Sequence, residues 1–220
     1  MNIGKNIAQI KESMPAGTRL VAVTKTKPEN IILDAYKSGH KIFGENKAQE
    51  LVQKYEALPK DIEWHFIGHL QTNKVKYIAP FIAMVHGIDS LKVLKAVNKE
   101  AGKNNRIIPC LLQFHIAQEE SKFGFSEDEA REILKSESFK SFTNVYIAGV
   151  MGMATYTVDV MQVRKEFRSL RDLFGRLKNE FFADDVRFRE ISMGMSDDYP
   201  VALQEGSTLI RVGSKIFGAR

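Results

Sequence analysis

Lys25 is the residue of this sequence best placed to do chemistry. It follows residues 20–23, an apolar run that the pattern predicts to be a buried strand. A lysine at the end of such a strand can lose part of its hydration, which lowers its pKa and makes the amine a nucleophile suited to Schiff-base formation. Spacing alone favours an ordinary surface lysine whose stem lies along the strand. Lys27, two residues further on, is expected to be solvated.

A second group of candidates lies near the carboxyl end of the sequence. Ser192 and Ser196 follow one predicted strand, and Gly213 and Ser214 follow another. Serine hydroxyls, and backbone N–H groups that glycine leaves accessible, are suited to holding a phosphate. Taken without their surroundings, two ordinary Gly/Ser turns explain the same residues equally well.

Arg211 precedes Gly213 by two residues, so both face the same side of the last predicted strand. A buried arginine is costly unless it is paired. Its charge therefore needs a carboxylate, a phosphate or the ring nitrogen of a ligand. An arginine beside a pyridine nitrogen would keep that nitrogen unprotonated and weaken the ligand as an electron sink.

Other polar residues support weaker hypotheses. Asn46 can bond a ligand or cap the helix that it precedes, and the local pattern favours the cap. His65 and His69 are four residues apart, but no nearby carboxylate completes a metal-ligand set, so core or loop histidines are the better interpretation. Lys122 could attract an anion, although a surface lysine is favoured.

Two further sets of residues are assigned structural roles. A solvated helix face is predicted for a basic group interleaved with acidic residues, namely Arg164, Lys165, Arg168 and Arg171. Core or pocket-lining positions are predicted for four methionines, namely Met151, Met153, Met193 and Met195.

The elements that must position these residues alternate regularly along the chain. The predicted strands are residues 20–23, 41–43, 62–67, 82–88, 107–116, 145–150, 186–192 and 208–212. Amphipathic helical segments separate them, at residues 2–12, 28–39, 46–58, 72–78, 89–99, 126–135, 158–182 and 199–204. Strands separated by helices predict a parallel sheet, and eight strands are the number that closes a (β/α)8 barrel. An open, doubly wound sheet is the alternative.

The barrel prediction brings the candidates together. The carboxyl ends of barrel strands meet on one face, where the active sites of such barrels lie. Lys25, Asn46, Ser192, Arg211 and Gly213 all follow or end predicted strands, so we expect them to converge there. The first helix precedes the first strand and almost nothing follows the last one, so that first helix is expected to cover the barrel wall left open.

Composition limits the class of protein. The 220 residues are 44% hydrophobic and 27% charged, which predicts one globular domain spanning residues 1–220. The net charge of +5 comes without a long Lys/Arg run, which disfavours nucleic-acid binding. No apolar run approaches the ~20 residues of a membrane span, and no signal peptide is apparent. The single cysteine, Cys110, cannot form an internal disulfide, and the expected location is the reducing cytoplasm.

Several segments together resemble a known family. They are residues 21–28 (VAVTKTKP), 43–46 (FGEN) with 49–50 (QE), 64–74 (WHFIGHLQTNK), 192–197 (SMGMSD) and 206–218 (GSTLIRVGSKIFG). In this order they resemble the YggS/PROSC family of pyridoxal phosphate homeostasis proteins, nearly end to end. The resemblance implies a single barrel similar to the N-terminal domain of bacterial alanine racemase, without the C-terminal β domain.

The resemblance also implies a cofactor and its contacts. Pyridoxal 5′-phosphate (PLP) would be bound as an internal aldimine on Lys25, with Asn46 near the ring and Arg211 facing the pyridine nitrogen. The phosphate would lie where the family holds it, near Ser192, Ser196, Gly213 and Ser214. The sequence departs from the family at residues 47–48 (KA) and 113–115 (QFH), which puts the pocket shape near His115 in doubt.

The resemblance implies a carrier that holds PLP and releases it to other proteins, with PLP-dependent apoenzymes as candidate recipients. A racemase would need the base that the second domain of alanine racemase supplies, so catalysis is not expected. A monomer is expected because the dimer interface of alanine racemase is lost without that second domain. Two alternatives stay open: a weak PLP-dependent amino-acid racemase or other PLP enzyme, and a barrel enzyme acting on an unrelated phosphorylated substrate. A pure interaction module would give no reason for an inward lysine and arginine.

Overall fold

Eight parallel strands form a closed barrel in the computed structural model, which describes residues 2–119 and 123–218. The strands are β1 (Arg19–Val23), β2 (Ile42–Glu45), β3 (Glu63–Phe66), β4 (Met84–Ile88), β5 (Ile108–Phe114), β6 (Val145–Gly152), β7 (Glu190–Ser192) and β8 (Leu209–Val212). Each strand pairs with the next along the chain, and β8 pairs with β1. The predicted barrel is confirmed, and the open sheet is excluded.

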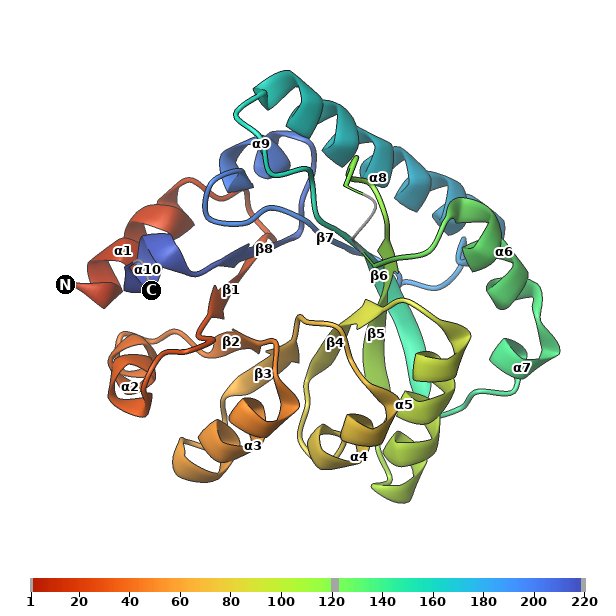
Figure 1. The fold of residues 1–220 in the computed structure, drawn as a ribbon, viewed down its shortest axis with the longest axis horizontal. Helices are drawn as coiled ribbons and strands as arrows, with labels where there is room; N and C mark the ends of the chain where they lie inside the picture. Colours follow the sequence, from red (N-terminus) through yellow and green to blue (C-terminus); the bar gives the residue numbers. More distant parts are fainter. Residues whose placement is uncertain (1, 120–122, 219–220) are drawn as a thin grey trace.

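Helices surround the barrel (Figure 1). They are α1 (Ile3–Glu12), α2 (Glu29–Lys37), α3 (Ala48–Ala57), the 3-10 helix η1 (Thr72–Lys74), α4 (Val75–Ile78), α5 (Leu91–Lys103), α6 (Glu127–Lys135), α7 (Glu137–Lys140), α8 (Val160–Phe181), α9 (Tyr199–Gln204) and α10 (Ser214–Phe217). The sequence did not predict α7 and α10, because four residues are too few to show a helical period. The capping box predicted at Ser126 is present, with Glu129 as its reciprocal partner.

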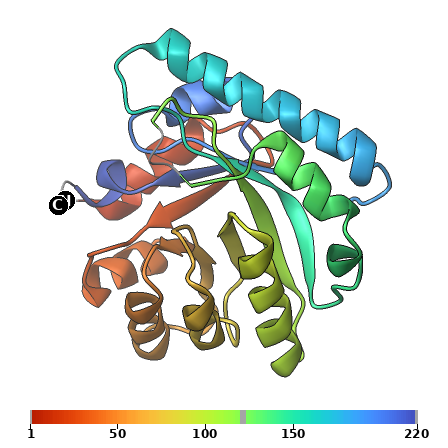
Figure 2. The same ribbon diagram turned by 45° about the vertical axis from the view of Figure 1, so that its right-hand side comes forward.

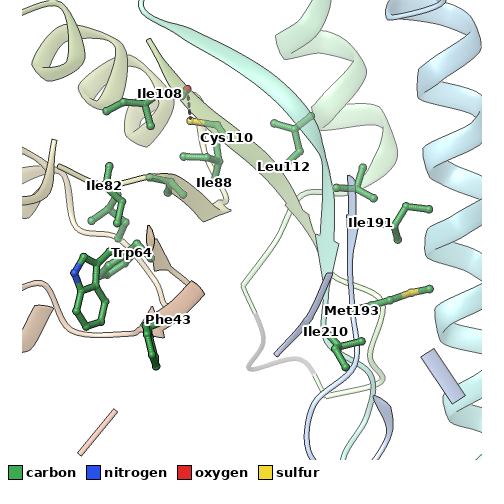
Figure 3. Close-up of a cluster of buried hydrophobic side chains, with 14 of the residues drawn as sticks. Phe43, Trp64, Ile82, Ile88, Ile108, Cys110, Leu112, Ile191, Met193 and Ile210 are labelled. Atoms are coloured by element: carbon green, nitrogen blue, oxygen red, sulfur yellow. Dashed lines mark hydrogen bonds between the residues drawn. The ribbon is translucent and has the colours of Figure 1, made fainter. Parts of the chain in front are cut away.

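Two layers of side chains fill the barrel and its surroundings because successive strand residues point to opposite faces. The inner layer contains Val21, Met84, Leu111, Ala148, Met151 and Leu209. The outer layer packs between strands and helices, and Figure 3 shows part of it, including Phe43, Trp64 and Met193. Cys110 is buried in this outer layer, and burial raises the pKa of its thiol.

The seventh strand is shorter than predicted. The sequence assigned residues 186–192, but β7 contains only Glu190–Ser192. Val186 is 82% exposed, and the N–H of Phe188 bonds the carbonyl of Asp185 in a turn. The β6–β7 approach depends on Gly149, whose φ is 151° and whose added Cβ would lie 1.8 Å from the carbonyl oxygen of Glu190. Only glycine allows this contact.

The two ends of the chain close the wall beside β1 and β8. Helix α1 buries Ile3, Ile7 and Ile10 and lies beside α10 in both views (Figures 1 and 2). The side-chain amide of Asn6 donates to the carbonyl of Ile216 at 2.9 Å. Helix α1 therefore covers this wall as predicted, but it shares the role with α10, which the sequence analysis did not foresee. Within the described ranges, no helix is long and apolar enough to cross a membrane.

Candidate functional site

A cavity of about 470 Å³ opens at the carboxyl ends of the strands. Six of the seven residues proposed from the sequence line it, namely Lys25, Asn46, Ser196, Arg211, Gly213 and Ser214. Met153 and Met195 line it as well, which confirms a pocket-lining position for two of the four methionines. Phe123 and Tyr156 also contribute, and no periodic pattern singled them out because both lie in loops.

The backbone around Lys25 is held by helix α3. The ammonium of Lys54 donates to the carbonyl of Thr24 at 2.8 Å, and the carboxylate of Glu50 accepts from the N–H of Thr26 at 2.6 Å. The two residues that flank Lys25 are thus both bonded to one helix. Thr26 has a φ of 65°, a left-handed conformation that a β-branched residue rarely adopts, so its bond to Glu50 stabilises a strained position.

A buried ion cluster lies behind these contacts. The Lys54 ammonium also bonds the carboxylates of Glu45 at 2.7 Å and Glu50 at 2.6 Å. The Thr24 hydroxyl donates to the same oxygen of Glu45 at 2.6 Å, and the second oxygen of Glu45 is buried without a hydrogen-bond partner. Burial raises the pKa of Glu45, and the bonds from Lys54 and Thr24 oppose that rise. No local pattern predicted that the side chain of Lys54 would be buried.

Lys27 was expected to be solvated, but the structure shows its side chain bonded within the protein. Its ammonium donates to the carbonyl oxygens of Phe217 and Gly218, each at 3.2 Å, and the side chain also lines the cavity. The lysine links the loop after β1 to the end of α10. This contact joins segments 190 residues apart, which explains why local sequence could not indicate it.

Arg211 is fixed inside the barrel by neutral partners. One guanidinium nitrogen donates to the hydroxyl of Ser192 at 2.6 Å and another to the carbonyl of Gly152 at 3.1 Å. Only 4% of Arg211 is exposed, and burial lowers its pKa to about 10, although the charge of Asp198 opposes this change. An inward arginine was expected to need partners, and two of the partners of Arg211 are a hydroxyl and a carbonyl.

Ser192 lies deeper than the sequence argument placed it. Its side chain is fully buried, and it does not appear among the described residues that line the cavity. Its hydroxyl is already bonded to Arg211 and lies 2.9 Å from Nδ1 of His86. Ser192 therefore supports Arg211 from behind, rather than facing the cavity with the other proposed phosphate contacts.

Two histidines continue this chain through the barrel. Nε2 of His86 lies 2.9 Å from Nδ1 of His65. Because arginine only donates, the arrangement that satisfies every group has Ser192 donating to His86 and His86 donating to His65. Burial lowers the pKa of His65 to about 3 and that of His86 well below its usual value, so both rings stay neutral. The expectation that His65 is a core histidine is confirmed.

The proposed phosphate contacts lie at the ends of β7 and β8. The N–H of Gly213 donates to the hydroxyl of Ser196 at 3.1 Å, and Ser214 begins α10 beside them. An added Cβ on Gly213 would lie 3.2 Å from the carbonyl oxygen of Val23, so the last strand approaches the first closely here. The structure thus brings Ser196, Gly213 and Ser214 together at one side of the cavity.

Asn46 is not a helix cap. Helix α3 begins at Ala48 and its N-cap residue is Lys47, so Asn46 lies outside the helix. Its side chain is half-buried and lines the cavity. The prediction of a cap was wrong because β2 ends at Glu45, two residues later than predicted, and the helix begins correspondingly later. An added Cβ on Gly68 would lie 2.6 Å from the carbonyl oxygen of Asn46, so the loops after β2 and β3 are in close contact.

His69 is separated from His65 and pairs with a carboxylate. Its Nδ1 lies 2.7 Å from Oδ2 of Asp89, and its ring lines the cavity. In the part of the chain that the structure describes, no group of three or more His, Cys, Asp or Glu residues could hold a metal ion. Lys122, the remaining basic candidate near the mouth, lies outside the described residues.

The basic face of α8 is not simply solvated. Arg164, Arg168 and Arg171 all bond the carboxylate of Glu205, whose side chain is only 3% exposed. These bonds lower the pKa of Glu205. They attach α8 to the residue that follows α9, in the connection between β7 and β8. The sequence could not predict this contact because its partners are 34 to 41 residues apart.

The comparisons with known proteins agree with this architecture. The family model for the alanine racemase N-terminal domain matches residues 1–220. The pyridoxal phosphate homeostasis protein of Aquifex aeolicus (strain VF5) is 38% identical over 203 residues, which cover 92% of this chain and 87% of that protein.

Solved structures show the same barrel. The structure of PipY from Synechococcus elongatus PCC7942 without PLP superposes with a TM-score of 0.91 at 31% identity, covering 98% of this chain and 100% of PipY. PipY with PLP bound gives a TM-score of 0.88 at 30% identity. Alanine racemase from Bartonella henselae shares the fold, with a TM-score of 0.70 at 15% identity over 99% of this chain and 58% of that enzyme. Sequence, fold and cavity together show that the chain belongs to the YggS/PROSC family of pyridoxal phosphate homeostasis proteins, which is built on the alanine racemase N-terminal barrel.

Proposed function

We propose that this protein binds PLP in the cavity at the carboxyl end of the barrel, through a Schiff base to Lys25, and releases it to other proteins. The observation that carries the proposal is that Lys25 and the buried Arg211 line the same cavity as Ser196 and Gly213. The names of the relatives and the PLP-bound PipY structure support the choice of cofactor.

The residues present fit the chemical groups of PLP. When bound, PLP supplies an aldehyde carbon that an amine can attack. Lys25 offers that amine, and Arg211 offers a cationic donor for the pyridine nitrogen. Ser196, Gly213 and Ser214 offer hydroxyl and N–H groups suited to a phosphate. Asn46 is proposed to lie near the ring. Ser192 is proposed to act through Arg211, because its hydroxyl is already bonded to that residue.

Arg211 is the observation that favours a carrier over an enzyme. A cation beside the pyridine nitrogen disfavours protonation of that nitrogen, and an unprotonated ring withdraws electrons weakly. Transaminase and decarboxylase chemistry both need electrons withdrawn from the amino-acid α-carbon. We therefore propose that the protein stores and transfers PLP without turning over amino acids.

The absorption spectrum of the purified protein with PLP tests the proposal. We expect a visible Schiff-base band, and after borohydride reduction a pyridoxyl adduct on the peptide that contains Lys25. Lys25→Ala should lose both. Lys27→Ala is a matched control, since its ammonium bonds two backbone carbonyls, and it should keep the band. A band that survives in Lys25→Ala, or an adduct on another peptide, would overturn the assignment.

Two further measurements address release and catalysis. A PLP-dependent apoenzyme mixed with the loaded protein should gain activity, and PLP-dependent apoenzymes are the proposed recipients. Exchange of amino-acid α-protons in deuterated water should not exceed that of free PLP, and faster exchange would favour the racemase alternative. A monomer is proposed, and sedimentation of the loaded protein should show one.

A further inference from the structure

His69 and Asp89 form a polar dyad at the edge of the cavity. His69 lies in the loop after β3, and Asp89 directly follows β4. Nδ1 of His69 is 2.7 Å from Oδ2 of Asp89, and the other carboxylate oxygen accepts from the hydroxyl of Ser90 at 3.3 Å. The side chain of Asp89 is 7% exposed, whereas that of His69 is 42% exposed. A nearly buried carboxylate thus holds an imidazole that reaches solvent.

The imidazole is oriented from a second direction as well. The ring of Phe123 stacks on His69, with ring centroids 4.3 Å apart and an interplanar angle of 18°. Phe123 is itself held, because its carbonyl accepts from the side-chain amide of Gln113 at 2.9 Å. A histidine whose Nδ1 donates to a carboxylate keeps Nε2 available to accept and return a proton. The His69 ring is therefore oriented by two contacts, a hydrogen bond to Asp89 and a stacked ring from Phe123.

The position of the dyad relative to Lys25 follows from the barrel. Lys25 follows β1 and His69 follows β3, with β2 between them, and both residues line the same cavity. Two strand spacings amount to about 10 Å between backbones. Lys25, Asn46 and His69 all line this cavity, and a general acid–base can act on its partner directly or through one water.

We propose that His69, oriented by Asp89, is the general acid–base that makes and breaks the bond between Lys25 and the cofactor. It would thereby set how fast PLP is captured and how fast it is released. This inference rests on the proposed function. It assigns to His69 the rates of PLP capture and release, and not the equilibrium affinity for PLP.

The proton transfers balance without any redox partner. In capture, the neutral amine of Lys25 forms a C–N bond to the aldehyde carbon, and His69 moves the proton from nitrogen to the former carbonyl oxygen. His69 then takes the second proton from the nitrogen and passes it to that oxygen, which leaves as water while the C=N bond forms. In release, water forms the C–O bond, the C–N bond breaks, and the amine leaves with a proton that His69 returns.

A catalyst of this kind has a distinctive kinetic signature. It lowers one barrier, so it accelerates capture and release by the same factor and leaves the dissociation constant unchanged. A residue that merely shapes the cavity changes the dissociation constant instead. Rapid mixing with increasing PLP concentrations separates these cases. In a plot of the observed rate constant of band formation against PLP concentration, the slope is the rate constant of capture and the intercept is that of release.

His69→Gln is the main variant. It keeps a polar side chain of similar reach and removes the imidazole ring. We expect both rates to fall together, on the order of 100-fold, with an unchanged dissociation constant. Asp89→Asn should lower both rates by a smaller equal factor, because it weakens the orientation of the imidazole. His115→Gln is the matched control, since His115 bonds the carbonyl of Glu119 at 2.7 Å outside the cavity lining, and it should leave both rates unchanged.

Chemical rescue separates proton transfer from packing. Free imidazole should restore capture and release in His69→Ala in proportion to its concentration, and should have little effect on the wild-type protein. Phe123→Leu removes the stacked ring but keeps the dyad, and should slow the rates far less than His69→Gln. Circular dichroism should confirm that every variant folds, which the exposure of His69 leads us to expect.

The outcomes distinguish this inference from the proposed function. If wild type forms no band with PLP, the proposed function fails. If wild type forms the band but His69→Gln keeps both rates within twofold, only the role of His69 is overturned. A changed dissociation constant with no rescue by imidazole would likewise overturn it and would assign His69 a structural role.

Discussion

The guanidinium of Arg211 lies 2.6 Å from the hydroxyl of Ser192, and both side chains are enclosed by the barrel. Beyond Ser192 the hydrogen bonds continue to His86 and then to His65. A cation at the floor of the cavity is therefore supported by a fully neutral polar chain along the barrel interior. This chain fixes the position of Arg211 without neutralising it, which leaves its charge available to a ligand.

Ser192→Ala tests whether this chain stabilises the fold. The substitution leaves a donor of Arg211 and the Nδ1 of His86 without their bonds at buried positions. We expect the free energy of unfolding of the cofactor-free protein to fall by about 1–3 kcal/mol in a urea titration. Ser141→Ala, which removes an exposed hydroxyl bonded to the carbonyl of Ser138, should have a much smaller effect. Equal effects of the two substitutions would show that the chain does not stabilise the barrel.

Arg211→Met should separate stability from binding. The arginine is buried against a hydroxyl and a carbonyl, so replacing it with an apolar side chain removes a costly buried charge. We expect the cofactor-free protein to be as stable as wild type or more so, while its affinity for PLP falls by about tenfold or more. Thermal unfolding and PLP titration measure the two quantities. Arg189→Met, at an arginine whose side chain is 74% exposed at the opposite end of the barrel, should leave affinity unchanged.

The buried histidines predict a loss of stability in mild acid. Burial holds His65 neutral in the folded protein down to about pH 3, whereas the unfolded chain takes up a proton near pH 6.5. Between those values the unfolded state binds more protons, so the free energy of unfolding falls as the pH falls. In His65→Gln, the slope of unfolding free energy against pH between about pH 5 and 6.5 should be shallower by up to about 1.4 kcal/mol per pH unit. A slope equal to that of wild type would contradict the buried, neutral state of His65.

The ion cluster behind Lys25 predicts strong coupling between its members. Lys54→Met leaves the fully buried carboxylate of Glu45 without its cation, and we expect a cost of about 3–5 kcal/mol in urea unfolding. Adding Glu45→Leu removes the stranded charge and should recover much of that loss. Lys103→Met breaks an exposed pair with Glu100 and serves as the control, with little expected change. If the double variant is no more stable than Lys54→Met, the cost comes from packing rather than from the buried charge.

Sequence reasoning located most of the elements and most of the cavity. The alternation of short apolar runs with amphipathic segments predicted the eight strands and their helices, because both periods are local properties of the chain. Lys25, Arg211 and Gly213 could be placed at strand ends from the same pattern, and the structure brings them to one cavity. The predictions that Asn46 caps a helix and that Lys27 is solvated failed, because each depended on where a neighbouring strand or terminus ends.

The amino-acid sequence by itself determined the order of strands and helices, the family, and the lysine at the end of the first strand. Only the tertiary structure decided which polar side chains meet. His65, His86 and Ser192 come from three strands, and their bonds depend on the register between strands. The same holds for the pairing of His69 with Asp89 and of Lys54 with Glu45. Such contacts depend on strand tilt and helix packing across the whole barrel, which no local pattern encodes.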